Sequence, residues 1–184
     1  MNKLLSVRTI VATAIGAALF FVLGRFVAIP SPVPNTTISV QYGVLAFIAA
    51  LFGPVAGVLA GLIGHFFIDF SQPWGLWWSW IIASGFFGLI MGIISFKLKL
   101  DEGDFKTRSI ILFNVSQVVA HAIAWIVIAP ILDIQIYGEP ANKVFTQGAV
   151  GALANIVTTA IIGTLLCIAY SKAIPKKGSL KEED

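Results

Sequence analysis

The sequence of 184 residues is 58% hydrophobic and 11% charged, with a mean hydropathy of +0.92. Soluble domains carry about 25% charged residues, so this composition excludes a large soluble domain and predicts an all-α membrane protein. The net charge of +3 does not indicate a nucleic-acid partner, because the basic residues flank apolar segments and form no patch interleaved with aromatic side chains. With Cys167 as its single cysteine, the chain has neither a disulfide framework nor a CxxC metal site.

Ten of the twelve Lys and Arg residues lie in three short segments: at the N-terminus, between residues 97 and 108, and from residue 172 onward. By the positive-inside rule all three face the cytoplasm, which predicts a multi-pass membrane protein with both termini cytoplasmic. The apolar run over residues 10–29 exceeds the roughly 7 to 15 residues of a signal-peptide core. We interpret it as a retained first helix.

A membrane span needs about 20 predominantly apolar residues, and the chain offers six candidates. They cover residues 7–29, 39–52, 54–70, 77–97, 109–130 and 144–170. The sequence therefore predicts six transmembrane helices in one membrane domain over residues 1–174, followed by a disordered cytoplasmic tail over residues 175–184. Residues 71–75 and 131–142, the latter with Asp133, are expected to form outer loops, and residues 98–107 a cytoplasmic turn.

The second span is too short to cross alone, and Gly53-Pro54 ends it. The segment before it, residues 30–38, contains three prolines, which favour extended backbone. Such backbone is tolerated at membrane depth only where protein covers it or where it lines a cavity. We therefore predict that this loop dips inward from the outer surface and helps to form an outward-facing pocket.

Polar residues of the fifth span fall on one helical face. Asn114, Gln117, His121 and Trp125 form a stripe at about 100° per residue, flanked by apolar residues. The stripe must face the bundle interior, where it either contacts a ligand or bonds neighbouring helices. Gln147, Asn155 and Thr158 continue a similar face in the sixth span; for the last two we favour bonds between helices.

Two ionisable residues, His65 and Asp69, lie one turn apart in the third span, where such groups are costly and usually functional. Asp69 is near the outer end, so it faces either solvent or the pocket. Two candidate ligands without a third are weak evidence for a metal, and we expect neither a metal nor a cofactor. Arg25 either snorkels to the outer interface, pins the proline-rich loop or meets an anionic ligand group.

Tryptophans cluster at the outer start of the fourth span, where an interfacial aromatic belt is one explanation. Trp77 and Trp80 can instead face inward beside Trp125, and together they suit a flat heterocycle. The residues expected to contact such a ligand are Arg25, Asn35, Gln41, Tyr42, His65, Asp69, Trp77, Trp80, Asn114, Gln117, His121, Trp125 and Gln147.

The first span carries a flat face of small residues, Ala14, Ala17 and Ala18. Such a face lets another helix approach closely, either within the bundle or from a partner subunit. No Walker loop, GxSxG or HExxH motif is present in the sequence, so we expect no enzyme. A pocket without a nucleotide site implies downhill transport, coupling to an ion, or a borrowed ATPase.

The chain resembles the substrate-binding S components of energy-coupling factor (ECF) vitamin transporters. The resemblance rests on length, six spans, the outer loop between the first two spans and Ala14-x-x-x-Ala18, which matches the AxxxA docking motif of that family. Residues 24–36 resemble a subgroup associated with hydroxymethylpyrimidine or pyridoxine-like molecules.

The resemblance implies a subunit that captures a vitamin precursor from outside and docks through its first helix, with Ala14 and Ala18, on a transmembrane coupling subunit served by two cytoplasmic ATPases. An autonomous permease or channel for a small polar solute is the alternative. A membrane enzyme would require His121 to act as an acid or base.

Overall fold

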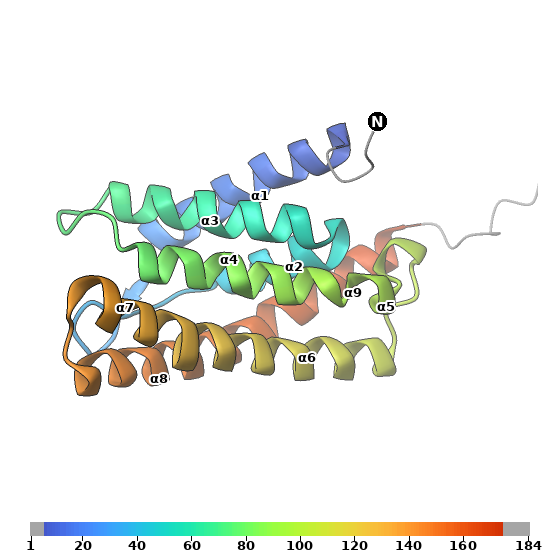
Figure 1. Cartoon of the computed structure of the whole chain (residues 1–184). Helices are drawn as coiled ribbons and strands as arrows, with labels where there is room; N and C mark the ends of the chain where they lie inside the picture. Colours follow the sequence, from blue (N-terminus) through green and yellow to red (C-terminus); the bar gives the residue numbers. More distant parts are fainter. Residues whose placement is uncertain (1–5, 175–184) are drawn as a thin grey trace, which may run out of the picture.

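A computed structural model describes residues 6–174, and the tail predicted for residues 175–184 lies outside them. It is a helical bundle with one two-stranded antiparallel hairpin (Figure 1). The elements are α1 (Val7–Phe26), β1 (Ile29–Pro30), β2 (Thr37–Ile38), α2 (Gln41–Phe52), α3 (Pro54–Phe70), α4 (Trp78–Ile93), α5 (Ser95–Leu98), η2 (Leu100–Glu102), α6 (Thr107–Ala122), η3 (Ile123–Ile128), α7 (Ala129–Tyr137), α8 (Ala141–Thr158), η4 (Thr159–Gly163) and α9 (Thr164–Ala173).

Four continuous helical stretches within the described residues are long and apolar enough to cross a membrane: Val7–Phe26, Trp78–Leu98, Thr107–Tyr137 and Ala141–Ala173. Helices α2 and α3 are shorter, at 12 and 17 residues. The short α2 ends where the sequence predicts, because Gly53 adopts a φ of 86° and Pro54 opens α3. The membrane nature of the chain is clear, and the count of six spans stays a prediction.

The predicted outer loop over residues 131–142 is wrong in extent. The fifth span continues as α7 to Tyr137, and α8 begins at Ala141. Pro130 does not end the helix, because it lies in the first turn of α7 directly after η3, a π-helical segment. A proline without an N–H is tolerated where the local hydrogen-bond ladder is already shifted. Gly138, with a φ of 67°, ends the helix instead.

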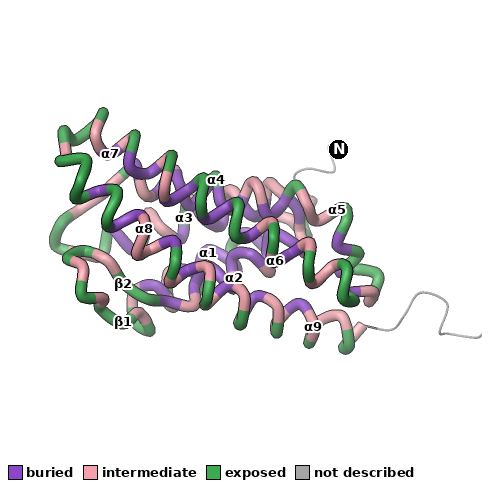
Figure 2. The backbone as a smooth tube through the Cα atoms, turned by 90° about the horizontal axis from the view of Figure 1, so that it is seen from below, coloured by how far each residue is buried: buried purple, intermediate pink, exposed green. Residues whose placement is uncertain are grey.

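The described ends of the chain lie together. In Figure 1 the start of α1 and the end of α9 are at the same end of the bundle as α5, and the α7–α8 turn is at the other end. Figure 2 places the β1–β2 hairpin at this second end. The described basic residues of these segments, Arg8, those between 97 and 108 and Lys172, therefore lie at one end of the molecule. The cytoplasmic orientation of that end remains a prediction of the positive-inside rule.

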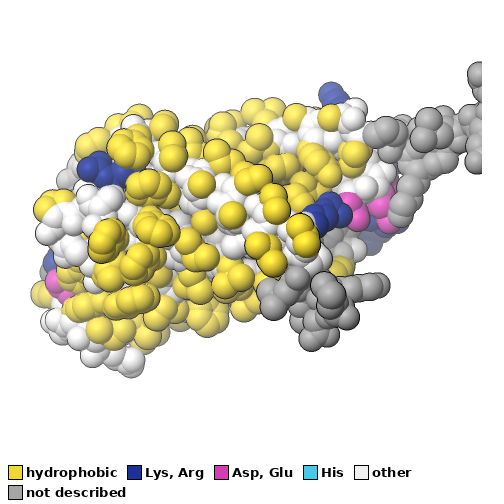
Figure 3. Space-filling view, turned by 90° about the horizontal axis from the view of Figure 1, so that it is seen from above, with side chains coloured by type: hydrophobic (Ala, Val, Ile, Leu, Met, Phe, Trp, Pro, Cys, Tyr) yellow, Lys and Arg dark blue, Asp and Glu magenta, His cyan; other side chains and the backbone are white. Residues whose placement is uncertain are grey.

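Small residues hold the first helices close together. A Cβ added to Gly57 of α3 would lie 2.4 Å from the carbonyl oxygen of Gly88 in α4, so the two backbones touch as in other membrane helix pairs. Fully buried Phe20, Phe87 and Phe113 fill the interior, and buried residues follow the inner side of each helix (Figure 2). On the flank of the bundle that Figure 3 shows, hydrophobic side chains cover the middle and charged side chains lie toward the two ends.

Candidate functional site: a cavity with polar groups and an apolar groove

A cavity of about 500 Å³ lies between the β1–β2 hairpin and helices α2, α3, α4, α7 and α8. Most of the residues predicted to contact a ligand line it, although they come from distant parts of the sequence. They are Asn35, Gln41, Tyr42, His65, Asp69, Trp77, Trp80, Trp125 and Gln147.

One wall of the cavity is aromatic. The rings of Trp80 and Trp125 stack at 5.6 Å with 17° between their planes, and Tyr42 meets Trp125 edge-on at 5.1 Å. A third ring between the two tryptophans would need about 7 Å. A flat ligand therefore packs against the exposed side of this wall and does not enter between its rings.

A polar cluster adjoins this wall through Tyr42, whose ring meets Trp125 and whose hydroxyl meets Ser84. Ser84 Oγ lies 2.8 Å from Tyr42 Oη and 2.5 Å from His65 Nδ1. His65 Nε2 lies 3.7 Å from Asp69 Oδ1, and the backbone N–H of Trp77 donates to Asp69 Oδ2 over 3.0 Å. The cavity therefore presents the hydrogen-bonding groups of His65 and Asp69 near a flat apolar surface, a combination typical of small-molecule sites.

The hairpin covers the cavity. Residues of the proline-rich segment 30–37 line it, as the inward-dipping loop requires. Asn35 adopts a left-handed conformation with a φ of 57°, and Gln147 Nε2 of α8 donates to the carbonyl oxygen of Pro34 over 2.9 Å. This bond ties the tip of the hairpin to the far side of the bundle.

Asp133 lines the cavity, and the sequence reasoning missed it because it was placed in an outer loop. Its side chain is 2% exposed and accepts hydrogen bonds from Ser79 Oγ and, over 3.1 Å, from Trp80 Nε1. The signal that would have found it is the apolar run that continues past Pro130 to Gly138. Other lining residues also went unassigned to the pocket, among them the polar or aromatic residues Gln72, Trp74, Lys143 and Asn155.

Four residues predicted as ligand contacts lie outside the cavity wall: Arg25, Asn114, Gln117 and His121. The Arg25 guanidinium lies over the ring of Phe26, 5.5 Å from its centroid. Asn114 Nδ2 donates to Thr164 Oγ1 over 2.9 Å, and Gln117 Nε2 to the carbonyl oxygen of Ile156 over 3.3 Å. Asn114 and Gln117 therefore make hydrogen bonds to neighbouring helices, the second of the two roles considered for the polar stripe.

His121 lies directly behind the aromatic wall. Its ring is fully buried, its Nδ1 accepts the indole N–H of Trp125 over 2.9 Å, and its Nε2 lies 3.1 Å from Thr159 Oγ1. His121 thus links Trp125 of η3 to Thr159 of η4 on the neighbouring helix and fixes the orientation of the Trp125 ring. Both partners lie in π-helical segments, which often occur at functional sites.

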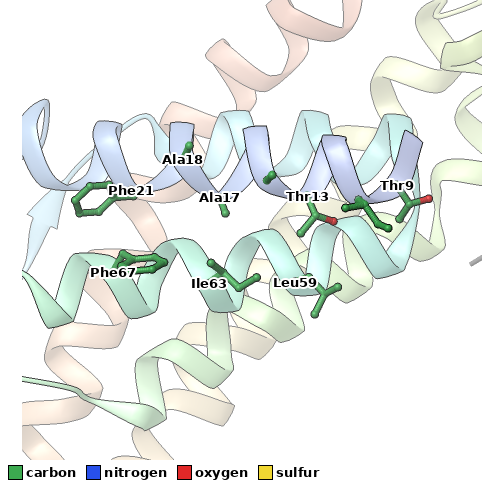
Figure 4. A pocket seen from close by; sticks show the side chains of 10 residues that line it. Thr9, Thr13, Ala17, Ala18, Phe21, Leu59, Ile63 and Phe67 are labelled. Atoms are coloured by element: carbon green, nitrogen blue, oxygen red, sulfur yellow. The ribbon is translucent and has the colours of Figure 1, made fainter. Parts of the chain in front are cut away.

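A second hollow, of about 600 Å³, runs between α1 and α3 on the flank of the bundle. Ala14, Ala17 and Ala18 line it from α1, and Leu59, Ile63 and Phe67 from α3 (Figure 4). Ala17 is buried, whereas Ala14 and Ala18 are exposed. We call this surface the α1–α3 groove.

Comparison with known proteins shows the family to which this chain belongs. The family model described as "ECF-type riboflavin transporter, S component" matches residues 4–172. The chain belongs to the S components of ECF-type transporters. This S component is similar to a UPF0397 protein of Exiguobacterium sp., with 56% identity over 96% of each chain, and to one of Staphylococcus aureus strain MSSA476, with 52% identity over 97% of each chain.

A solved structure described as the S component for biotin from an ECF-type ABC transporter shares the fold of this S component. The TM-score is 0.65 at 16% sequence identity, and the match covers 96% of this chain and 97% of the other. The family is a class of transporter subunit and not of enzyme, and its members work with an ECF module of ATPases and a coupling subunit. The expected family and membrane location are confirmed at this level.

Proposed function

We propose that this S component captures a small heterocyclic vitamin or vitamin precursor at the outer face of the bacterial cell membrane. The observation that carries the proposal is the cavity of about 500 Å³, which combines an aromatic wall with an adjoining cluster of polar side chains. Its volume falls within the roughly 300 to 1,000 Å³ of small-molecule sites. The names of the matching family and of the solved structure mention riboflavin and biotin, both heterocyclic vitamins, which supports the ligand class.

Within this class we favour a hydroxymethylpyrimidine or pyridoxine-like molecule, on the resemblance of residues 24–36. The cavity lies toward the hairpin end, opposite the basic segments that we expect in the cytoplasm. A ligand therefore enters from outside, under the hairpin, and is released inward only after the S component meets its module.

We further propose that the α1–α3 groove docks on the coupling subunit, with Ala14, Ala17 and Ala18 at the contact. Small side chains allow a partner helix to approach the α1 backbone, and the groove is almost entirely apolar. The two cytoplasmic ATPases of the module then supply the energy that this chain does not obtain itself.

The first test is mass spectrometry of small molecules released from the detergent-purified chain after production in vitamin-rich cells and extensive washing. One co-purifying heterocycle in a stoichiometric amount is the expected result. Calorimetric titration with riboflavin, biotin, hydroxymethylpyrimidine and pyridoxine then measures the dissociation constants. A chain that releases no heterocycle and binds none of these four compounds would contradict the proposed function.

A further inference from the structure

The hydrogen bonds of Ser84 determine which ring nitrogen of His65 carries a proton. A serine hydroxyl has one proton to donate, and Ser84 Oγ has three polar neighbours: the carbonyl oxygen of Trp80 at 3.1 Å, Tyr42 Oη and His65 Nδ1. The carbonyl can only accept, so all three contacts are hydrogen bonds only when Ser84 donates to Trp80 and both Tyr42 Oη and His65 Nδ1 donate to Ser84. In the neutral ring, Nδ1 of His65 then holds the proton, and Nε2 is a hydrogen-bond acceptor.

This acceptor faces a second one. His65 Nε2 lies 3.7 Å from Asp69 Oδ1, beyond the range of a direct hydrogen bond, and both residues line the cavity. Asp69 accepts from the backbone N–H of Trp77 and from the side chain of Trp74. A carboxylate offers about four acceptor positions, so Asp69 keeps capacity toward His65 and the cavity.

We propose that His65 Nε2 and Asp69 Oδ1 form a two-acceptor seat for the amino group of a heterocyclic ligand; this rests on the proposed function and narrows its ligand class to aminoheterocycles. Two acceptors 3.7 Å apart subtend roughly 80° at a nitrogen that lies about 2.9 Å from each. The two N–H bonds of an aromatic amino group diverge by about 120°, so each points within about 20° of its acceptor. A carbonyl oxygen at this position would face two acceptors and be repelled.

The other charged groups of the cavity wall do not offer such a seat. Asp133 has spare acceptor positions, but its hydrogen-bond partners, Ser79 Oγ and Trp80 Nε1, are both donors, so no second acceptor stands beside it as His65 Nε2 stands beside Asp69. Lys143 Nζ is 2.6 Å from Glu139 Oε2 and carries donors, not acceptors. The seat therefore lies on the α3 side of the cavity, next to the aromatic wall of Trp125 and Tyr42.

The test compares two ligands that differ at one group. Isothermal titration measures the affinity of the purified full chain in lipid nanodiscs for 4-amino-5-hydroxymethyl-2-methylpyrimidine and for its 4-oxo analogue. The wild type is expected to prefer the amino compound roughly 10- to 100-fold, the range for a hydrogen bond to a charged group. In Asp69→Asn the introduced amide can keep the Trp77 bond through its oxygen and donate its N–H to His65 Nε2, which fills the seat. The affinities of this variant for the amino and the oxo compound should therefore be about equal.

Asp133→Asn is the matched control, because it changes a buried carboxylate of the same cavity that takes no part in the seat. It should retain the preference even where both affinities fall. His65→Phe is the second variant, in case Asp69→Asn does not fold; it removes the Nε2 acceptor and leaves Ser84 its bond from Tyr42. Retention of the wild-type preference in either folded variant would overturn the seat.

The outcomes separate the two proposals. Equal affinity of the wild type for both pyrimidines, or binding of riboflavin, biotin or pyridoxine but of neither pyrimidine, overturns the seat and leaves the proposed function intact. A chain that binds none of the five compounds and releases no heterocycle on purification overturns the proposed function and the seat with it.

Discussion

The cavity and the α1–α3 groove have similar volumes, about 500 and 600 Å³, and opposite chemistry. Carboxylates, amides, a histidine and an aromatic stack surround the cavity, whereas the polar side chains of the groove are Thr9 and Thr13. Helix α3 contributes to both hollows from different faces, with His65 and Asp69 toward the cavity and Leu59, Ile63 and Phe67 toward the groove. Volume alone therefore does not identify a ligand site; the groups on its walls do.

The strongest way to separate the two regions is to fill the groove. In Ala14→Trp/Ala18→Trp, two large rings occupy the surface that we expect to meet the coupling subunit. Uptake of labelled ligand into cells that also produce the ECF module should fall at least tenfold, and the dissociation constant of the purified chain should stay within about twofold, because neither residue lines the cavity.

Leu19→Trp is the control for this experiment, since Leu19 is also exposed on α1 but does not line the groove. It should leave uptake and binding unchanged. Normal uptake in the double variant would show that the coupling subunit docks elsewhere.

Removing the aromatic wall should give the reverse result. Trp125→Ala deletes the ring that stacks on Trp80 and meets Tyr42, and ligand affinity should fall roughly 10- to 100-fold, the range for loss of one stacked ring. Trp78→Ala is the matched control, because Trp78 is 47% exposed and does not line the cavity. Equal effects in a fluorescence or calorimetric titration would mean that the ligand does not use this wall.

Local sequence signals predicted the frame of the molecule well. Gly53-Pro54 ends α2 because backbone conformation at that point is decided by the two residues themselves. The polar stripe on the fifth span faces the interior because helical period fixes direction. Period does not fix depth, however: from Asn114 to Trp125 the stripe runs about 16 Å along the helix, and only Trp125 lines the cavity.

Hydrogen bonds between residues far apart in the chain could not be predicted from the sequence. Nothing local to Asp133 indicates that Ser79 and Trp80, more than 50 residues away, donate to its carboxylate. The predicted fifth span ended at residue 130, whereas the π-helical segment η3, which packs against α4 and α8, leads directly into α7 and carries the helix past Pro130. The same holds for His121, whose role behind Trp125 is set by Thr159 on another helix.

His121→Phe tests whether a residue outside the cavity wall acts through Trp125. The substitution keeps a buried ring but removes the acceptor for the Trp125 indole N–H, so Trp125 loses its fixed orientation. Ligand affinity should fall about 3- to 10-fold, in line with one neutral hydrogen bond. His121→Gln, which can still accept this bond, should recover part of the loss.

Asn114→Leu provides the remote comparison for His121→Phe. It removes the bond to Thr164 far from the cavity, so the thermal unfolding temperature should fall while the dissociation constant does not change. A loss of affinity as large as that of His121→Phe would mean that general loosening of α6, and not the orientation of Trp125, controls binding.

The smallest expected effect concerns the hairpin over the cavity. Gln147→Ala removes the side-chain bond to the carbonyl oxygen of Pro34 and frees the hairpin tip to move away from α8. Because the ligand must leave past this tip, stopped-flow dissociation should accelerate about 3- to 5-fold, the value of one partly exposed hydrogen bond, with a smaller change in the association rate. Thr146→Ala on the same turn loses a bond within α8 and should leave the dissociation rate unchanged. An unchanged rate in Gln147→Ala would contradict a role of this bond in holding the ligand, because either the ligand leaves by another route or the packing of the proline-rich segment closes the cavity without the bond to α8.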